Sequence, residues 1–433
     1  MKKITGRAVS VLLIAALVMF GMVMYLAQYI EHGQEWALYF SRANSGSTGV
    51  LIDRNGEMLA AFDATHNLFS SDQLTREANY HVTGDYWGRT GTGLITRYWK
   101  ELQDFSLLTG TTRAESSILQ LNINAELNNK MYRAIGKNNN GCMMLCNYRT
   151  GELLGMVSSP AMDPLFPEGD IRDGTFINRC VSASFTPGSV FKLITSAAAI
   201  ENIPNIDELS FECEGEYDIA GVTITCMAEH GTQSFEQALA NSCNCAFAQI
   251  AVMLGQDTMV KYVRDYGFLE SHELSGIPAV AGNYPLEFVG DPELAWSGIG
   301  QSTDLVCPYT MLRFLCAVAN DGILVEPDIV RNSNSAEPVR LMAAGTAEKL
   351  QRMMRINVVE HYGQENFPGL ELCAKTGTAE LGDTEPHSWF AGFLTDEEHP
   401  YAFVTLIEHG GFGIEAAGGA TNKVLQWAVK EMN

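Results

Sequence analysis

The stretch F-T-P-G-S-V-F-K-L-I-T-S at residues 185–196 carries the strongest local signal for both fold and chemistry. Pro187 and Gly188 interrupt the preceding chain, and the apolar run that follows has Lys192 as its only charge, which predicts a turn leading into a helix. Ser189 lies near the start of that helix, and Lys192 follows one turn later on the same face. Because apolar neighbours disfavour a charged lysine, its amine can accept the proton of the serine hydroxyl.

On these residues alone, an activated serine and an amphipathic helix with a surface lysine are equal alternatives. Two further motifs occur once each and favour the activated serine: S-C-N at Ser242–Asn244, expected in a loop between helices, and K-T-G at Lys375–Gly377, expected on a late strand. Together and in this order, the three motifs are the signature of serine acyl-transfer enzymes that react with penicillin.

The residue types of the first two motifs fit acyl transfer. Ser189 is expected to attack a carbonyl carbon, and Lys192 to accept its proton. Ser242 is expected to relay that proton to the leaving amine, while Asn244 binds the amide of the substrate.

The K-T-G motif supplies groups for substrate binding. Lys375 offers a positive charge to a terminal carboxylate, and the Thr376 and Thr378 hydroxyls can donate to the same group. Gly377 is expected to let the substrate backbone approach the strand edge. The backbone N–H groups of Ser189 and Thr378 are expected to form the oxyanion hole.

Size and charge limit the classes of protein that this chain can belong to. Its 433 residues, 46% of them hydrophobic, suffice for two folded domains. The balance of 51 acidic against 28 basic residues gives a net charge of -23. This charge argues against nucleic acid and against a broad anionic membrane surface as partners.

An uncharged apolar run at Ala8–Ala27 has the length of a membrane-spanning helix. Basic residues precede it, and Glu31 and Glu35 follow it, so the positive-inside rule predicts a single-pass plasma-membrane protein whose catalytic part is extracytoplasmic. A cleaved signal peptide is the alternative. The length of the run and the missing small-x-small cleavage site favour the anchor.

The ten cysteines are too sparse for a small disulfide-stapled scaffold. Cys213 and Cys226 bracket a polar stretch and are the best disulfide candidates, although whether they form a bond stays open. No double C-x-x-C pattern occurs, and neither His230 nor His387 has a second histidine at metal-ligand spacing, so we expect no metal, no cofactor and packing or loop roles for both. Three cysteines in apolar stretches are expected to be small buried residues: Cys142, Cys146 and Cys316.

The chain before the catalytic part is expected to contain a cytoplasmic N-terminus with the anchor at residues 1–40, spanning at about 8–27, and a membrane-proximal domain of mixed structure at 41–138. Its strongest local signal is a hairpin at Val50–Ala60, whose apolar arms flank Asn55-Gly56. Weaker patterns predict a helix at 94–102, a strand at 119–123 and a helix at 125–135.

Residues 139–433 are expected to form the catalytic domain. A hairpin at 142–147 and 153–157 supplies two strands, and three more are predicted at 372–378, 388–393 and 401–408. Helical patterns lie at 235–254, 258–266, 308–320, 346–361 and 422–432. Two early and three late strands predict an α+β fold, in which one antiparallel five-stranded sheet is flanked by helices.

The sequence resembles the class B penicillin-binding proteins, the membrane-anchored D,D-transpeptidases of bacterial wall synthesis, over nearly all of the chain after the anchor. Beyond the three motifs, the resemblance rests on these stretches: I-D-R-N-G-E-M-L-A from Ile52, T-G-E-L-L-G-M-V-S-S-P-A-M-D-P at 150–164, A-N-S-C-N-C-A-F-A from Ala240, G-I-G-Q-S at 298–302 and H-S-W-F-A-G-F from His387. It implies the serine β-lactamase and penicillin-binding transpeptidase fold on a small pedestal domain, with the K-T-G strand at a sheet edge. The residues that match as catalytic are Ser189, Lys192, Ser242, Asn244, Lys375, Thr376 and Thr378.

Two departures from the family pattern leave the reacting groups intact. The usual G-Q-G reads Gly300-Gln301-Ser302, and Cys243 and Cys245 flank Asn244. We therefore expect an active enzyme, in which the cysteines beside the site leave open a sensitivity to oxidation.

The resemblance implies a peptidoglycan D,D-transpeptidase that attacks the D-Ala-D-Ala end of a stem peptide and is inhibited by β-lactam antibiotics, in division or elongation. A β-lactamase, a β-lactam sensor and an inactive scaffold are the alternatives, the last disfavoured by the intact Ser189 and Lys192. Because no second catalytic signature precedes the transpeptidase domain, a membrane glycosyltransferase partner is implied as well.

Overall fold

The computed structural model describes residues 2–40, 49–62, 67–103, 105–106, 110–111, 117–166, 168, 171–284, 290–333, 336–382 and 384–432. The chain divides into two compact units: residues 1–51, 60–68 and 98–119 in the first, and residues 52–59, 69–97 and 120–433 in the second. All three sequence motifs lie in the second unit.

The helix α1 (Lys2–Phe40) contains the predicted apolar run and continues beyond it at both ends. Within it, Gly6–Tyr29 is long and apolar enough to cross a membrane, with a mean hydropathy of 2.6. Its large side chains are exposed, and Leu12 and Leu17 each expose 70% of their surface. Such exposure suits a helix surrounded by lipid or a signal sequence, since both are apolar on every side.

The hairpin predicted around Asn55-Gly56 is confirmed. Its strands, β1 (Gly49–Ile52) and β2 (Met58–Phe62), belong to a sheet of order β3-β2-β1-β6 with β3 (Asn67–Phe69) and β6 (Ser117–Gln120). The helix predicted at 94–102 is divided into α4 (Leu94–Arg97) and α5 (Trp99–Gln103). Other short elements of this part of the chain are α2 (Gln73–Ala78), α3 (Tyr80–Thr83), β4 (Phe105–Ser106) and β5 (Gly110–Thr111).

The second unit is built on the predicted antiparallel five-stranded sheet. Its order is β17-β18-β19-β7-β8, so that early and late strands meet where β19 pairs with β7. The strands are β7 (Gly141–Asn147), β8 (Leu153–Ser159), β17 (Leu372–Leu381), β18 (Thr384–Leu394) and β19 (Tyr401–Ile407). The K-T-G motif lies on β17, an edge strand, as the family resemblance implied.

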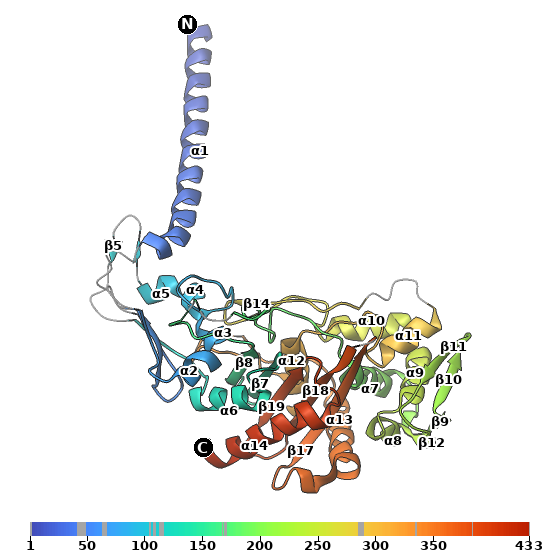
Figure 1. Ribbon diagram of the computed structural model, residues 1–433. Helices are drawn as coiled ribbons and strands as arrows, with labels where there is room; N and C mark the ends of the chain where they lie inside the picture. The colour runs from blue at the N-terminus through green and yellow to red at the C-terminus, as the bar shows by residue number, and fades with distance from the viewer. Residues whose placement is uncertain are drawn as a thin grey trace. The chain divides into compact units, whose positions relative to one another are not determined.

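Helices cover both faces of this sheet (Figure 1). On one face, α6 (Ala125–Ile135) and α14 (Gly419–Glu431) share a core with the strands that includes Met131, Phe390 and Leu425. On the other face, α12 (Pro308–Ala319) packs against β18 and β19. Because both faces are covered, the side chains of β8 and β19 are buried along the whole of each strand, and the sequence of each is a nearly continuous apolar run.

The remaining helices of the second unit include the predicted ones and one that the sequence did not reveal, α11 (Asp291–Gly298). The helical pattern at 235–254 is interrupted at the S-C-N motif, which joins α8 (Phe235–Ala240) to α9 (Asn244–Leu254). Two more of the predicted helices are α10 (Gln256–Asp265) and α13 (Ala344–Ile356).

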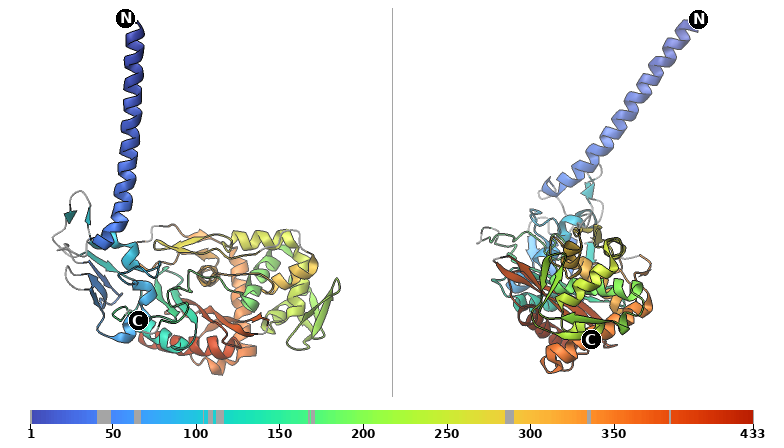
Figure 2. Two further views of the ribbon diagram at one scale, coloured as in Figure 1. Left: turned by 45° about the horizontal axis from the view of Figure 1, so that its top comes forward. Right: turned by 90° about the vertical axis from the view of Figure 1, so that its right-hand side faces the viewer.

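Short strands that the sequence analysis missed pair locally around these helices. Four of them lie beside α8 and α9 (Figure 2): β9 (Ser210–Cys213), β10 (Glu216–Ile219), β11 (Val222–Thr225) and β12 (Gly231–Ser234). The others are β13 (His272–Leu274), β14 (Ile277–Ala279), β15 (Ile323–Leu324) and β16 (Val339–Arg340). Strands of two to four residues carry too little alternation to be detected as a pattern.

Candidate active site

Ser189 lies in a 3₁₀ turn, η2 (Gly188–Phe191), that leads directly into α7 (Lys192–Asn202). The predicted turn followed by a helix is therefore confirmed. Gly188 has a φ of +56°, and a Cβ atom there would lie 2.8 Å from the carbonyl oxygen of Thr378. Only glycine combines this left-handed backbone with so close an approach of the serine turn to β17.

The Lys192 amine reaches the serine as its spacing predicted. Its Nζ lies 3.1 Å from Ser189 Oγ, and it also donates to the Ser242 carbonyl oxygen at 2.6 Å and to Asn244 Oδ1 at 2.8 Å. The side chain is completely buried, and this burial lowers the pKa of Lys192 to about 8. The neutral amine is therefore far more populated at neutral pH than in an exposed lysine, and it is placed to accept the hydroxyl proton.

A second buried lysine, Lys375, contacts the Ser242 hydroxyl of the S-C-N motif, which Lys192 also approaches. Lys375 Nζ donates to Ser242 Oγ at 2.8 Å, while Lys192 Nζ lies 3.4 Å from that oxygen. Burial, and then the charge of Lys192, lower the pKa of Lys375 well below its usual range. Ser242 has a φ of +51°, a strained conformation for a residue with a side chain, and this turn places its hydroxyl between the two amines.

The Asn244 amide is held at both ends. Its Oδ1 accepts from Lys192, and its Nδ2 donates to the carbonyl oxygen of Thr225 at 2.9 Å. The arrangement fixes which end of the amide faces the lysine. Asn244 therefore orients the Lys192 amine and also lines the pocket.

The outer edge of β17 faces the same pocket. Thr376 N–H donates to Oη of Tyr362 at 3.0 Å, from the π-helical turn η4 (Asn357–Gly363), and the Thr378 carbonyl accepts from Gln301 Nε2 at 3.5 Å. In an antiparallel strand, the N–H and the C=O of one residue point to the same side. The Thr378 N–H therefore also points outward from the edge of β17.

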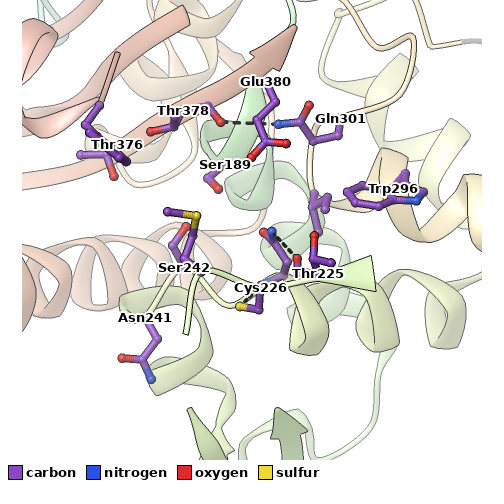
Figure 3. Close-up of a pocket in the computed structure, with 14 residues that line it drawn as sticks. Ser189, Thr225, Cys226, Asn241, Ser242, Trp296, Gln301, Thr376, Thr378 and Glu380 are labelled. Carbon is purple, nitrogen blue, oxygen red and sulfur yellow. Dashed lines mark hydrogen bonds between the residues drawn. The ribbon is translucent and has the colours of Figure 1, made fainter. Parts of the chain in front are cut away.

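These groups line one pocket, in which Ser189 lies between the β17 residues Thr376 and Thr378 and the hydroxyl-bearing Ser242 (Figure 3). Gly377 also has a packing role that the sequence did not predict. A Cβ atom there would lie 2.8 Å from the Pro187 carbonyl oxygen, so its glycine lets β17 pack against the serine turn. The structure thus brings all the predicted site residues together.

Sequence reasoning missed much of the pocket wall. The additional lining residues are Thr225, Cys226, Met227, Asn241, Trp296, Ile299, Gln301, Glu380 and Phe412. Several come from β11 and α11, which were not predicted, and Glu380 lies just beyond the K-T-G motif. Position after a motif was the one signal that could have identified Glu380.

His387 has the packing role that we predicted, and a neighbouring tryptophan packs beside the serine turn. The His387 ring packs edge-on against Phe185, with ring centroids 5.7 Å apart. Trp389 is fully buried as well, and its Nε1 donates to the Thr186 carbonyl oxygen at 3.0 Å. This bond braces the serine turn against β18.

The structure answers the question left open for the cysteines. All ten are free, so Cys213 and Cys226 form no disulfide. Both sulfurs instead approach Nδ1 of His230, at 3.5 and 3.6 Å. The three cysteines expected to be small buried residues are buried: Cys142, Cys146 and Cys316.

Comparison with known proteins identifies the family. Residues 141–426, well over half of the chain, match the family described as the penicillin binding protein transpeptidase domain. The chain belongs to this family. The predicted resemblance to class B penicillin-binding proteins is thereby confirmed.

Relatives of this penicillin-binding protein are distant but consistent in kind. Peptidoglycan D,D-transpeptidase PbpA of Mycolicibacterium smegmatis is 27% identical over 65% of this chain and 64% of its own, and PbpA of Mycobacterium tuberculosis is 28% identical over 67% and 66%. The chain therefore spans slightly less than two thirds of these relatives. Stage V sporulation protein D of Bacillus subtilis is 30% identical over 54% of this chain and 39% of its own.

Solved structures share the fold. PBPA of Mycobacterium tuberculosis superimposes with a TM-score of 0.76 at 23% identity, over 89% of this chain and all of that one. The D,D-transpeptidase domain from Eggerthella lenta gives 0.76 at 22% identity, over 90% of this chain and all of that one. The predicted α+β transpeptidase fold is confirmed.

The hydrogen bond between Tyr362 and β17 predicts that removing the tyrosine hydroxyl lowers the stability of the protein measurably. Tyr362→Phe leaves the Thr376 N–H without its partner, so we expect a loss of about 1–2 kcal/mol in the free energy of unfolding. Tyr266→Phe is the control, because the Tyr266 hydroxyl is buried without a hydrogen-bond partner among the described residues. Chemical unfolding of the full-length protein in detergent would measure both. Equal losses in the two variants would contradict the assigned role of Tyr362.

Proposed function

We propose that this protein is a peptidoglycan D,D-transpeptidase that works through an acyl-serine at Ser189 and is inhibited by β-lactams. The observation that carries the proposal is the buried Lys192 amine, 3.1 Å from the Ser189 hydroxyl and held by the S-C-N motif. The family and the PbpA relatives, which are named as D,D-transpeptidases, support it. Mycobacterium tuberculosis PBPA has been solved as a penicillin G acyl-enzyme complex, in keeping with β-lactam inhibition.

In the proposed reaction, Ser189 Oγ attacks the carbonyl carbon between the two terminal D-alanines of a stem peptide, and its proton passes to Lys192 Nζ. The N–H groups of Ser189 and Thr378 stabilise the negative oxygen of the tetrahedral intermediate. As the C–N bond breaks, the leaving D-alanine takes a proton through Ser242 Oγ. An amine from a neighbouring stem then attacks the ester, which forms the cross-link and frees the Ser189 hydroxyl.

Substrate binding is assigned to the edge of β17. Lys375, with the Thr376 and Thr378 hydroxyls, is placed to bind the terminal carboxylate of the stem peptide. The negative charge of that carboxylate would stabilise the protonated form of Lys375. Asn244 orients Lys192 and contacts the amide of the stem peptide. The extended stem peptide would run along the outer edge of the strand.

The helix α1 is proposed to anchor the protein in the plasma membrane with the catalytic domain outside. The division into a pedestal at 41–138 and a catalytic domain at 139–433 belongs to this proposal. Glycan polymerisation for division or elongation would come from a membrane glycosyltransferase partner. If cross-linking in membranes captured the full-length protein with no such polymerase, this partnership would be abandoned.

The proposed acyl-enzyme predicts a covalent adduct at one residue. Full-length protein in detergent, incubated with benzylpenicillin, is expected to gain the mass of the drug on the peptide containing Ser189, and Ser189→Ala is expected to gain none. Persistence of the adduct supports a transpeptidase. Rapid drug consumption without a lasting adduct would instead identify a β-lactamase, and no reaction would point to an inactive scaffold.

The lowered pKa of Lys192 predicts how acylation depends on pH. Below its pKa of about 8 the amine is an ammonium group and cannot accept a proton, so the acylation rate should fall about tenfold per pH unit well below pH 8 and level off above it. Stopped-flow acylation by benzylpenicillin between pH 6 and 9 would measure this. In Lys192→Arg the side chain stays charged, so the acylation rate should be at least about 100-fold lower at every pH. A flat profile would contradict Lys192 as the base.

A further inference from the structure

Four side chains with metal-binding atoms converge beside the S-C-N motif. They come from different elements: Cys213 ends β9, Cys226 follows β11, His230 precedes β12, and Cys243 caps the N-terminus of α9. Their ligand atoms all lie within 4.8 Å of one another. No role in the acyl-transfer chemistry accounts for this convergence.

Three of the six distances between the ligand atoms fit a single tetrahedral ion. Nδ1 of His230 lies 3.5 Å from Cys213 Sγ and 3.6 Å from Cys226 Sγ, and the Cys226 and Cys243 sulfurs are 3.9 Å apart. Bonds of about 2.3 Å to sulfur and about 2.0 Å to nitrogen place the vertices of a tetrahedron about 3.5 Å (N to S) and about 3.8 Å (S to S) apart. The three distances therefore match the edges of a zinc coordination tetrahedron.

We propose that Cys213, Cys226, His230 and Cys243 bind one Zn²⁺ ion as a closed structural site. Three thiolates and one imidazole are the donor set that favours zinc over magnesium or calcium, and four protein ligands leave no open position for a substrate. Binding replaces the thiol protons, which pass to solvent. The sequence analysis predicted no metal, since the pattern C-x12-C-x3-H-x12-C matches no short zinc motif.

Backbone groups around the cluster support thiolates rather than packed thiols. Asn244 N–H donates to Cys226 Sγ at 3.3 Å, and Ala246 N–H donates to Cys243 Sγ at 3.4 Å. Such bonds fix the orientation of a ligand and stabilise its negative charge. Cys213 and Cys243 are buried, whereas Cys226 and His230 are partly exposed, which gives an ion a path into the site.

The ion would hold the catalytic turn in its strained conformation. Cys243 lies between Ser242, whose φ is +51°, and Asn244, and both neighbours bond to the Lys192 amine. Zinc bound to Cys243 and Cys226 would join this turn to the end of β11, where Cys226 lines the pocket wall. Its role is positioning: the metal touches neither the substrate nor the reacting atoms.

Metal analysis of the full-length protein in detergent tests the proposal. After dialysis against zinc and removal of the excess ion, elemental mass spectrometry should find about one zinc per chain. Cys213→Ser should lose nearly all of it, whereas Cys316→Ala, which changes an equally buried thiol on α12, should keep it. Co²⁺ in place of zinc should give the intense visible bands of a tetrahedral thiolate site, a readout that does not depend on any variant folding.

Three results would overturn the proposal: no zinc retained, a Co²⁺ spectrum without thiolate bands, or a disulfide among the three cysteines in peptide mass mapping. A chelator should also slow acylation by benzylpenicillin at least tenfold, with recovery on adding zinc. That last readout rests on the proposed function. Because Ser189→Ala should keep its zinc while losing the adduct, failure of the metal site and failure of the acyl-enzyme can be distinguished.

Discussion

Two buried lysines that share one serine hydroxyl are the constraint on which the rest of the site depends. Lys192 and Lys375 are completely buried, and Ser242 Oγ lies within 3.4 Å of both amines. Among the described residues neither lysine forms an ion pair, and their partners are hydroxyl, carbonyl and amide oxygens. Two full charges would be very costly there, so burial disfavours the state in which both amines are charged at once.

The scaffold keeps these groups in place through close backbone contacts. Gly188 brings the serine turn against Thr378, and Gly377 brings β17 against Pro187. Gly300, with a φ of +76°, comes so close to the same turn that a Cβ would lie 2.6 Å from Phe191 Cβ. A packed sheet and three close approaches therefore hold the nucleophile, its base and the strand edge in one geometry, as preorganised catalysis requires.

Sequence identified the reacting groups and the five-stranded sheet because both depend on local patterns. The i,i+3 spacing of Ser189 and Lys192 and the short apolar runs of the strands need no distant contact to be recognised. Most of the pocket wall could not be predicted in this way, since Thr225 and Trp296 reach it only through tertiary packing.

Other features stayed hidden for the same reason. The metal-binding cluster combines residues from four elements, three of which are strands or turns too short to show a pattern. The serine at position 302, where the family usually has glycine, was visible in the sequence as a departure from the family pattern. The backbone strain at this serine could not be seen there. The structure gives Ser302 a φ of +70°, so this serine occupies a left-handed position that favours glycine.

The most direct test of the account is a crystal structure of the protein after reaction with benzylpenicillin. We expect an ester at Ser189 Oγ, with the acyl oxygen accepting hydrogen bonds from the N–H groups of Ser189 and Thr378 and the drug carboxylate beside Lys375, Thr376 and Thr378. An ester on another residue, or an acyl oxygen turned away from both N–H groups, would contradict the site assigned to this protein.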